Sequence, residues 1–275
     1  MSGKTILITG CSSGIGYAAA HMLRARGWRV FAACRQQKDC DRLRAAGFDA
    51  PLIDYADEAG TLAALEDVLR ETGGTLDALF NNGAYAIPGA LEDLPTDALR
   101  AIFEANLFGW HSLTRAVIPV MRAQGHGRIV QCSSVLGLVA MPWRGAYTAT
   151  KFALEGLTDT LRVEMRDTGI EVIGIEPGPI TTAFRANSIL QFERWINWQN
   201  AARADQYQSQ LRPRLYDSVK KARFELGPEA VVAKLIHAVE HPRPRPRYYV
   251  TLPTYIAGFM RRLLPTRMLD RALGG

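Results

Sequence analysis

The sequence has few cysteines and shows none of the spacings that cysteine and histidine adopt in disulfide frameworks or around metals. The four cysteines, Cys11, Cys34, Cys40 and Cys132, form no CxxC pair, which is typical of proteins in a reducing compartment. The five histidines are scattered and include no HExxH motif. We therefore expect no metal site.

Long apolar runs and a targeting segment are also missing. No apolar run approaches the ~18 residues that a membrane span requires. The first strand pattern begins at Thr5, which leaves no room for a signal peptide. Together with the cysteine usage, these absences predict a cytoplasmic protein.

The composition is that of a soluble globular protein, with 48% hydrophobic and 22% charged residues. A net charge of +6 suits an anionic partner such as a phosphorylated cofactor, a membrane surface or a nucleic acid. No long Lys/Arg run with interleaved aromatics is present, so we expect no nucleic-acid partner. No internal repeat or low-complexity block divides the 275 residues, which predicts one domain spanning residues 1–275.

Short apolar runs alternate with helical patterns along the chain. Strands are predicted at residues 5–9, 28–34, 51–54, 76–81, 129–132, 170–176 and 248–252. Runs rich in Val, Ile and Leu are typical of strands buried on both faces of a parallel sheet. The pattern therefore predicts an α/β fold, a doubly wound (Rossmann) parallel sheet of seven strands flanked by helices.

A glycine-rich turn joins the first strand to the first helix. Gly10, Gly14 and Gly16 have the spacing TGxxxGxG, which differs from the GxGxxG dinucleotide fingerprint. Such a turn lets backbone amides approach a pyrophosphate, and the helix N-terminus favours its negative charge. The alternative is a glycine-rich turn with no ligand.

The end of the second strand bears on cofactor choice. An acidic residue there accepts the 2′-hydroxyl of NAD, whereas an arginine accommodates the 2′-phosphate of NADP. Cys34 fills the acidic position and Arg35 follows, which favours NADP(H); the alternative is that Arg35 is a solvated loop cation. Asp54, at the end of the third predicted strand, is placed to accept a hydrogen bond from the adenine amino group.

Tyr147 and Lys151 lie four residues apart on a predicted helix, which places them on one face. A nearby ammonium favours the phenolate and so lowers the pKa of a tyrosine, and a phenol tuned in this way exchanges a proton with a carbonyl oxygen. Ser134, at the end of the preceding strand, is placed to donate to the same oxygen. The alternative is a surface tyrosine beside a solvated lysine.

Asn106 is predicted in the middle of a helix, among Phe103, Leu107 and Phe108. Asparagine is a poor helix former, so this placement suggests either a specific role or a polar residue on an exposed stripe.

Residues 183–226 break the alternation of strands and helices. The segment is rich in aromatic residues, namely Phe184, Phe192, Trp195, Trp198, Tyr207 and Tyr216. A long insertion after a sheet strand is typical of a lid, and we expect a helical substrate lid here.

The tail, residues 253–275, sets Ile256, Phe259 and Leu263 against Arg261 and Arg262. This amphipathic pattern favours core packing or a dimer contact over weak docking on a membrane surface.

The motifs together, in order and at their spacing, resemble the single-domain short-chain dehydrogenase/reductase family over essentially the whole chain. They are Thr9-Gly10-xxx-Gly14-Ile15-Gly16, Asn81-Asn82, Asn106, Ser134, Tyr147-xxx-Lys151 and Pro177-Gly178. The sequence around these motifs looks similar to members that act on retinoids, hydroxysteroids and aldehydes. The C-terminal third looks similar to bacterial NADP-dependent aldehyde reductases.

This resemblance implies a role for each matching residue. Tyr147 would be the general acid in carbonyl reduction, Lys151 would lower its pKa and hold the nicotinamide ribose, and Ser134 would polarise the carbonyl. Asn106 would distort its helix and hold a water linked to Lys151. The remaining cofactor-binding residues would be Gly10, Ser12, Ser13, Gly14, Ile15, Arg35, Asp54, Asn82, Pro177, Gly178, Ile180 and Thr182.

The expected function is reduction of a bulky, apolar aldehyde or ketone with NADPH, by an enzyme that acts as a homodimer or homotetramer. Two alternatives are a 3-oxoacyl carrier-protein reductase and a non-catalytic NADP(H)-binding regulator; a nucleotide-sugar epimerase or dehydratase fits the first turn less well. One departure from the family is the order Gly83-Ala84 where its members have Ala-Gly. This exchange could move backbone freedom by one residue.

Overall fold

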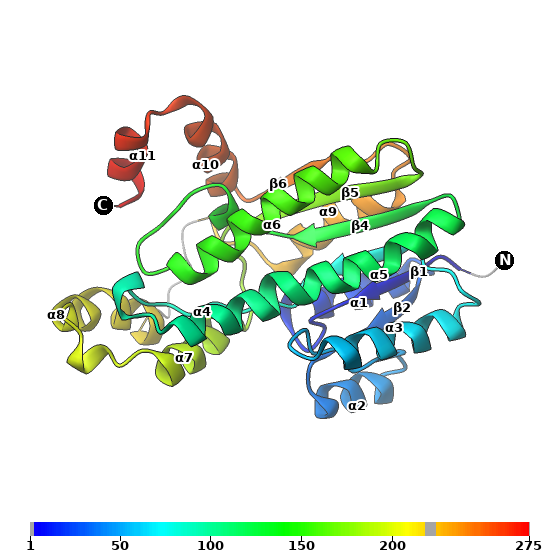
Figure 1. The fold of residues 1–275 in the computed structure, drawn as a ribbon, viewed down its shortest axis with the longest axis horizontal. Coiled ribbons are helices and arrows are strands. Elements are labelled where there is room, and N and C mark those ends of the chain that lie inside the picture. Colours follow the sequence, from blue (N-terminus) through cyan, green and yellow to red (C-terminus); the bar gives the residue numbers. More distant parts are fainter. Residues whose placement is uncertain (1–2, 218–223, 275) are drawn as a thin grey trace.

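In the computed structural model, which describes residues 3–217 and 224–274, six parallel strands form one sheet (Figure 1). The strand order is β2-β1-β3-β4-β5-β6. The strands are β1 (Thr5–Ile8), β2 (Arg29–Ala32), β3 (Ala78–Asn81), β4 (Gly127–Cys132), β5 (Ile170–Pro177) and β6 (Arg247–Val250). The predicted α/β fold with a parallel sheet is confirmed.

The prediction of seven strands was wrong, because residues 51–54 form no strand of the sheet. Beside β2 the chain makes two isolated bridges, Phe31 with Asp49 and Cys34 with Leu52. Pro51, which lies between the bridged residues, has no N–H to donate to a ladder. The segment accordingly touches the edge of the sheet without joining it.

Helices cover both faces of the sheet (Figure 1). On one face α5 and α6 lie in front of the strands, and α3 packs against α5; on the other, α1 packs against α9. Their bounds are α1 (Gly14–Ala25), α2 (Gln37–Ala45), α3 (Glu58–Glu71), α4 (Thr96–Phe103), α5 (Gly109–Ala123), α6 (Gly145–Glu164) and α9 (Pro228–Glu240). With both faces covered, β1 and β3 are buried along their whole length, as the apolar runs predicted.

The predicted lid is helical where it is described. It contains α7 (Phe184–Trp195), the single turn α8 (Ala204–Gln206), and two π-helical turns at Tyr207–Leu211 and Pro213–Asp217; residues 218–223 lie outside the described residues. Its side chains form a second apolar cluster, separate from the sheet core, with residues of α4 and α6. The lid thus packs on the part of α6 that carries Tyr147.

The tail forms α10 (Leu252–Leu263) and α11 (Thr266–Leu273), with residue 275 outside the described residues. Ala257 and Leu269 pack with Val139 in a small third cluster, and in Figure 1 both helices project from the body near the ends of β4 and β6. No helix among the described residues is long and apolar enough to cross a membrane.

Candidate active site

Tyr147 and Lys151 are both buried on α6, with 8% and 1% of their surfaces exposed. The Lys151 ammonium donates a hydrogen bond to the Cys132 carbonyl, at 2.8 Å, and lies 5.5 Å from the centre of the Tyr147 ring. It also lies 4.2 Å from the centre of the Trp110 ring, a cation–π contact. The alternative of a surface tyrosine beside a solvated lysine is therefore wrong.

The charges of these two residues are set mainly by burial. Desolvation lowers the pKa of Lys151 to about 8, although the neighbouring Cys132 and Glu155 oppose this shift. Desolvation also raises the pKa of Tyr147 well above its usual value; Cys132 adds to the increase, and a hydrogen bond with Ser134 and the charge of Arg144 reduce it. The net pKa of Tyr147 is thus raised where a lowered value was expected, because the loss of water around a buried phenolate outweighs the contacts that favour it.

Ser134 follows the last residue of β4 by two positions and begins a short 3-10 turn, Val135–Gly137. Its Oγ accepts the Leu136 N–H, at 3.1 Å. Because the oxygen is held in this way and its side chain also bonds to Tyr147, Ser134 and Tyr147 form one hydroxyl pair at the carboxyl end of β4. Such a pair suits donation to a carbonyl oxygen.

Asn106 is fully buried in a π-helical turn, Glu104–Phe108, between α4 and α5. Its amide donates to the Tyr85 carbonyl (2.8 Å) and accepts from the Tyr85 N–H (3.1 Å), and it also donates to Thr150 Oγ1 (3.3 Å). The predicted helix distortion is present, since π-helical turns are wider than α-helical ones and are frequent at functional sites. The exposed-stripe alternative is wrong.

The glycine-rich turn packs directly on the loop after β3. A Cβ on Gly10, whose φ is +70°, would lie 2.6 Å from Gly83 Cα, and one on Gly16 would lie 2.4 Å from the Gly10 carbonyl oxygen. The Asn82 amide donates to the Thr9 carbonyl at 3.0 Å, which ties the two loops together. This packing requires glycine at positions 10 and 16.

The exchange at Gly83-Ala84 moves no left-handed residue, because neither position has a positive φ. A Cβ at position 83 would lie 3.3 Å or more from its neighbours, the nearest being Gly10 N. Both residues of the exchange therefore have backbone conformations that residues other than glycine readily adopt.

The two ends of the predicted cofactor site lie together. A Cβ on Gly14, whose φ is +58°, would lie 3.0 Å from Thr182 Cβ, so the turn after β1 touches the segment after β5. Pro177 ends β5, Gly178 donates its N–H to the Val250 carbonyl, and Ile180 makes an isolated bridge to Leu226. Ser12, Ile15, Gly178, Ile180 and Thr182 are all half-buried, and Ser13 is exposed at the start of α1.

Arg35 is exposed three residues after the end of β2, and Asp54 is half-buried two residues after Leu52, which bridges to Cys34. Both lie near the Tyr85 hydroxyl: burial raises the pKa of Tyr85, the Arg35 charge lowers it and the Asp54 charge raises it. One Asp54 carboxylate oxygen accepts the Ala56 N–H, at 3.1 Å. The two residues therefore border one region beyond the carboxyl ends of β1 and β2.

Sequence reasoning missed three residues at this site. Arg42 of α2 donates to the Ser12 carbonyl at 2.7 Å, which places a second cation beside the glycine-rich turn. Trp110 contacts Lys151 and donates its Nε1–H to the Gly83 carbonyl at 2.9 Å. Phe184 of the lid packs edge-on against the Tyr147 ring, with centroids 5.4 Å apart. Only Phe184, as an aromatic in the predicted lid, gave a signal in the sequence.

A partly buried charge cluster includes Glu155, one turn after Lys151 on α6. Arg247 donates to Glu176 (2.8 Å), Asp159 (2.6 Å) and Glu155. Three carboxyl groups thus share one guanidinium. Desolvation and the nearby Glu155 raise the pKa of Glu176 to about 8, although Arg247 opposes them, so Glu176 is largely protonated at neutral pH.

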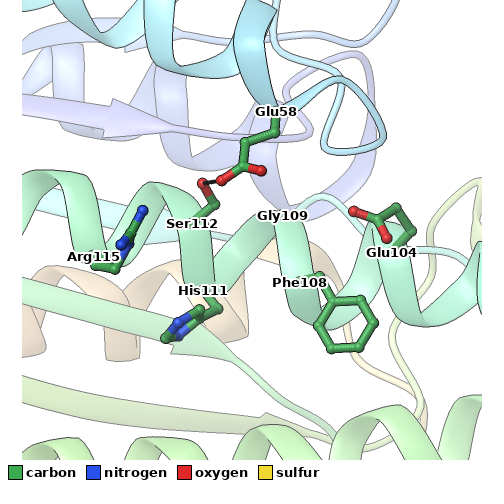
Figure 2. A pocket seen from close by; sticks show the side chains of 7 residues that line it. All are labelled: Glu58, Glu104, Phe108, Gly109, His111, Ser112 and Arg115. Atoms are coloured by element: carbon green, nitrogen blue, oxygen red, sulfur yellow. Dashed lines mark hydrogen bonds between the residues drawn. The ribbon is translucent and has the colours of Figure 1, made fainter.

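A separate cavity of about 260 Å³ lies beside α5 and the π-helical turn before it, with Glu58 of α3 in its lining. Figure 2 shows the side chains that line it, which are Glu58, Glu104, Phe108, His111, Ser112 and Arg115, together with Gly109. The Ser112 hydroxyl donates to Glu58 across it, at 2.6 Å. None of the predicted site residues lines this cavity.

Comparison with known proteins gives one family. The family model described as short chain dehydrogenase matches residues 4–191. The uncharacterized oxidoreductase YbbO of Escherichia coli K12 is 41% identical over 99% of this chain and 94% of its own length. Human 17-beta-hydroxysteroid dehydrogenase type 1 is 31% identical over 91% of this chain and 78% of its own. A short-chain dehydrogenase/reductase from Burkholderia phymatum, solved in complex with NAD, superposes with a TM-score of 0.77 at 27% identity over 99% of this chain and 95% of its own.

Proposed function

The chain belongs to the short-chain dehydrogenase/reductase family of oxidoreductases, and we propose that it reduces a bulky, apolar aldehyde or ketone to the alcohol with NADPH. The observation that carries this proposal is the buried group of Tyr147, Ser134 and Lys151 at the carboxyl ends of β4 and its neighbours. Ligands of doubly wound sheets bind at this edge.

The glycine-rich turn fits a dinucleotide. The backbone of Gly10 approaches Gly83 so closely that no side chain fits at position 10. Ser13, the N-cap of α1, makes no side-chain capping bond to the first amides of the helix. Those amides and the helix dipole are suited to a pyrophosphate. In the proposal, Gly10, Ser12, Gly14 and Ile15 line it, and Asn82, Pro177, Gly178, Ile180 and Thr182 border the remainder of the cofactor.

The bound cofactor supplies hydride, and the protein positions the carbonyl and handles the proton. At neutral pH Tyr147 is protonated, as an ordinary tyrosine is, and burial raises its pKa further; protonated is the form that donates to a carbonyl oxygen. Ser134 orients the same oxygen through its own hydroxyl. Lys151 holds a positive charge below pH ~8, which favours the phenolate left behind.

After Tyr147 gives up its proton, a new proton is proposed to reach it through the buried residues around Lys151 on α6. Asn106 bonds to Thr150, the residue before Lys151, and its widened helix turn is suited to hold a water that links Lys151 to solvent. Such a relay restores the protonated tyrosine after each turnover.

Two cations support the preference for NADPH over NADH. Arg35 is exposed three residues after the end of β2, and Arg42 reaches the Ser12 carbonyl from α2. A guanidinium makes paired hydrogen bonds with a phosphate, so a 2′-phosphate placed between Ser13 and Arg35 meets both charges. Asp54 is assigned to the adenine amino group.

The lid supports an apolar substrate. Phe184 packs against Tyr147, and the cluster that encloses this ring contains Trp143, Phe192 and Tyr207. An aromatic wall of this kind gives affinity to long-chain aldehydes, retinal or ring ketones through their apolar surface. Four buried, free thiols suit a reducing compartment, and the proposed enzyme is cytoplasmic, consists of one domain, and forms a homodimer or homotetramer through its long helices.

The test is a set of initial rates with NADPH and NADH against short and long aldehydes, retinal, steroid ketones and a 3-oxoacyl thioester. We expect kcat/KM to be higher with NADPH and to rise with the apolar surface of the substrate. Tyr147→Phe should lower kcat by at least ~10²–10⁴-fold while leaving NADPH binding, followed by fluorescence, unchanged.

Three results would count against the proposal. A higher kcat/KM with NADH contradicts the assignment of Arg35. A clear preference for the thioester points to the carrier-protein reductase. Intact NADPH binding without turnover on any substrate points to the non-catalytic regulator.

A further inference from the structure

Helix α10 turns its most apolar face to the solvent. Five large side chains, Leu252, Tyr255, Ile256, Phe259 and Leu263, are between 47% and 66% exposed. They recur at intervals of three and four residues, so they form one stripe along three turns. We call this set the α10 stripe.

The opposite face of the same helix is the one that packs on the protein. Thr254, Ala257 and Gly258 are buried, and a Cβ on Gly258 would lie 2.8 Å from the Tyr249 ring. A surface helix ordinarily buries its large apolar side chains and exposes its polar ones. Helix α10 does the reverse, so its stripe is suited to a partner outside the chain.

The stripe continues into an apolar groove. A hollow of about 510 Å³ lies between α9, β6 and α10, and Leu252 and Tyr255 belong to both the stripe and its lining. Tyr249 and Leu226 line the other side of the groove, with Lys234 also in its lining. The stripe and the groove together form one contiguous apolar surface, and exposed contiguous apolar patches mark contact sites.

Basic residues follow the stripe. Residues 252–274 contain four arginines, Arg261, Arg262, Arg267 and Arg271, and one acidic residue, Asp270; all four arginines are exposed. Arg262 is three residues after Phe259, which places it beside the stripe at its end. Long basic side chains next to exposed aromatic residues are the composition of a helix that lies in a membrane interface.

We propose that the α10 stripe docks on a lipid surface that carries anionic headgroups. The arginines then meet the headgroup phosphates, and Tyr255, Ile256 and Phe259 enter the boundary with the acyl chains. A second copy of the chain is a poorer occupant, because its identical segment carries the same four arginines and offers them only one acidic residue, Asp270.

The position of α10 links this surface to the active site. Ala257 packs with Val139 and lies near Val135, the residue after Ser134. The docked helix therefore brings the carboxyl edge of the sheet close to the lipid. The idea that this closeness helps an apolar substrate reach the site rests on the proposed function. The docking of α10 on lipid does not depend on that function.

The experiment is co-sedimentation of the full chain with phosphatidylcholine vesicles made with and without phosphatidylglycerol. We expect stronger binding to the anionic vesicles, and weaker binding as salt is raised. Ile256→Glu with Phe259→Glu should weaken binding at least ~10-fold, since both apolar anchors are replaced by anions. Arg261→Gln with Arg262→Gln should weaken binding to the anionic vesicles about fivefold for each charge, with little effect on neutral vesicles.

The matched control is Leu190→Glu, which also replaces an exposed apolar side chain (61% exposed, on α7) with an acid and should leave vesicle binding unchanged. Light scattering and far-UV circular dichroism check that the variants keep their mass and fold. Docking is overturned if the wild-type chain does not sediment with anionic vesicles, or if the Ile256/Phe259 variant binds as the wild type does. A fall in oligomer mass in that variant would instead assign the stripe to a second copy.

Discussion

The ammonium of Lys151 lies 4.2 Å from the centre of the Trp110 ring, and the same indole donates its N–H to the Gly83 carbonyl. One buried side chain of α5 thus contacts the lysine of α6 and holds the loop after β3. The negative face of the ring favours the charged lysine at a position where burial disfavours it. The charge state of Lys151 therefore depends on Trp110 as well as on the Cys132 carbonyl.

Replacing Trp110 should change the pH profile. The proposed mechanism needs charged Lys151, so kcat/KM should fall as the pH rises through about 8, the pKa of this lysine. Trp110→Leu removes the ring and lowers that pKa further, which should move the alkaline limb down by about 0.5–1.5 pH units. Trp110→Phe should move the limb less, because it keeps an aromatic ring beside Lys151, although it loses the hydrogen bond to the Gly83 carbonyl. An unchanged limb in Trp110→Leu would contradict the role given to this contact.

Arg35 should decide between the two nicotinamide cofactors. Arg35→Ala removes the charge proposed to meet the 2′-phosphate, which should lower kcat/KM for NADPH about 10–100-fold and leave the value for NADH within about twofold. Lys38→Ala, an exposed cation on α2, is the control and should leave both values nearly unchanged. Equal losses with both cofactors would show that Arg35 supports the fold and does not select the cofactor.

Gly10 and Gly83 face each other but should tolerate an added methyl group very differently. Gly10→Ala places a Cβ 2.6 Å from Gly83 Cα at a φ of +70°, and we expect a loss of ~2 kcal/mol or more in the free energy of unfolding. In Gly83→Ala the nearest atom is 3.3 Å away, so the cost should be below ~1 kcal/mol. Urea unfolding of both variants measures this difference; similar losses would mean that the two loops do not pack as described.

The Arg247 cluster should control how stability depends on pH. In the folded chain the pKa of Glu176 is about 8, against 4.5 for an ordinary glutamate. Between these two values the folded state holds a proton that the unfolded state has released, so the free energy of unfolding should fall as the pH rises from 4.5 to 8, by at most about 1.4 kcal/mol per unit. Glu176→Gln should remove this slope, because an amide does not titrate in this pH range. The amide oxygen still accepts the hydrogen bond from Arg247, so the cluster should keep its arrangement.

Removing the arginine is the contrasting change. Arg247→Met leaves Glu155 and Glu176 buried without their shared cation and should cost about 3–5 kcal/mol at pH 7. Because Glu176 loses its proton as the pH rises toward 8 and above, and its negative charge then meets that of Glu155 without the guanidinium, the loss should grow with pH. Thermal unfolding across the pH range tests both variants, and a larger cost for Glu176→Gln than for Arg247→Met would contradict this account.

Much of the fold could be read from local patterns. The buried run of β1 and the turn at Gly10 and Gly14 are set by side-chain type and by backbone freedom within a few residues. The missing strand at residues 51–54 shows the limit of this reasoning. Its apolar pattern predicts a strand, but membership of a sheet depends on partners, and Pro51 has no N–H to offer one.

Motif spacing named candidate residues that the structure brings together, but it did not predict their electrostatics. The spacing of Tyr147 and Lys151 follows from helix geometry, whereas the direction of each pKa shift follows from burial, which the lid and the π-helical turn create together. Trp110 gave no signal, because nothing within α5 marks which of its side chains meets a residue of α6. Arg42 was likewise found only through its contact with Ser12.

The sequence by itself determined the family, the α/β class and the identity of the candidate residues, because motif spacing and apolar periodicity are local properties of the chain. Tertiary structure decided which of those residues lose their water and which surfaces stay uncovered. Periodicity marks α10 as amphipathic, but it cannot say which face meets the protein. Packing settled that Ala257 and Gly258 face inward and Phe259 outward, since close approach to Tyr249 leaves room only for small side chains.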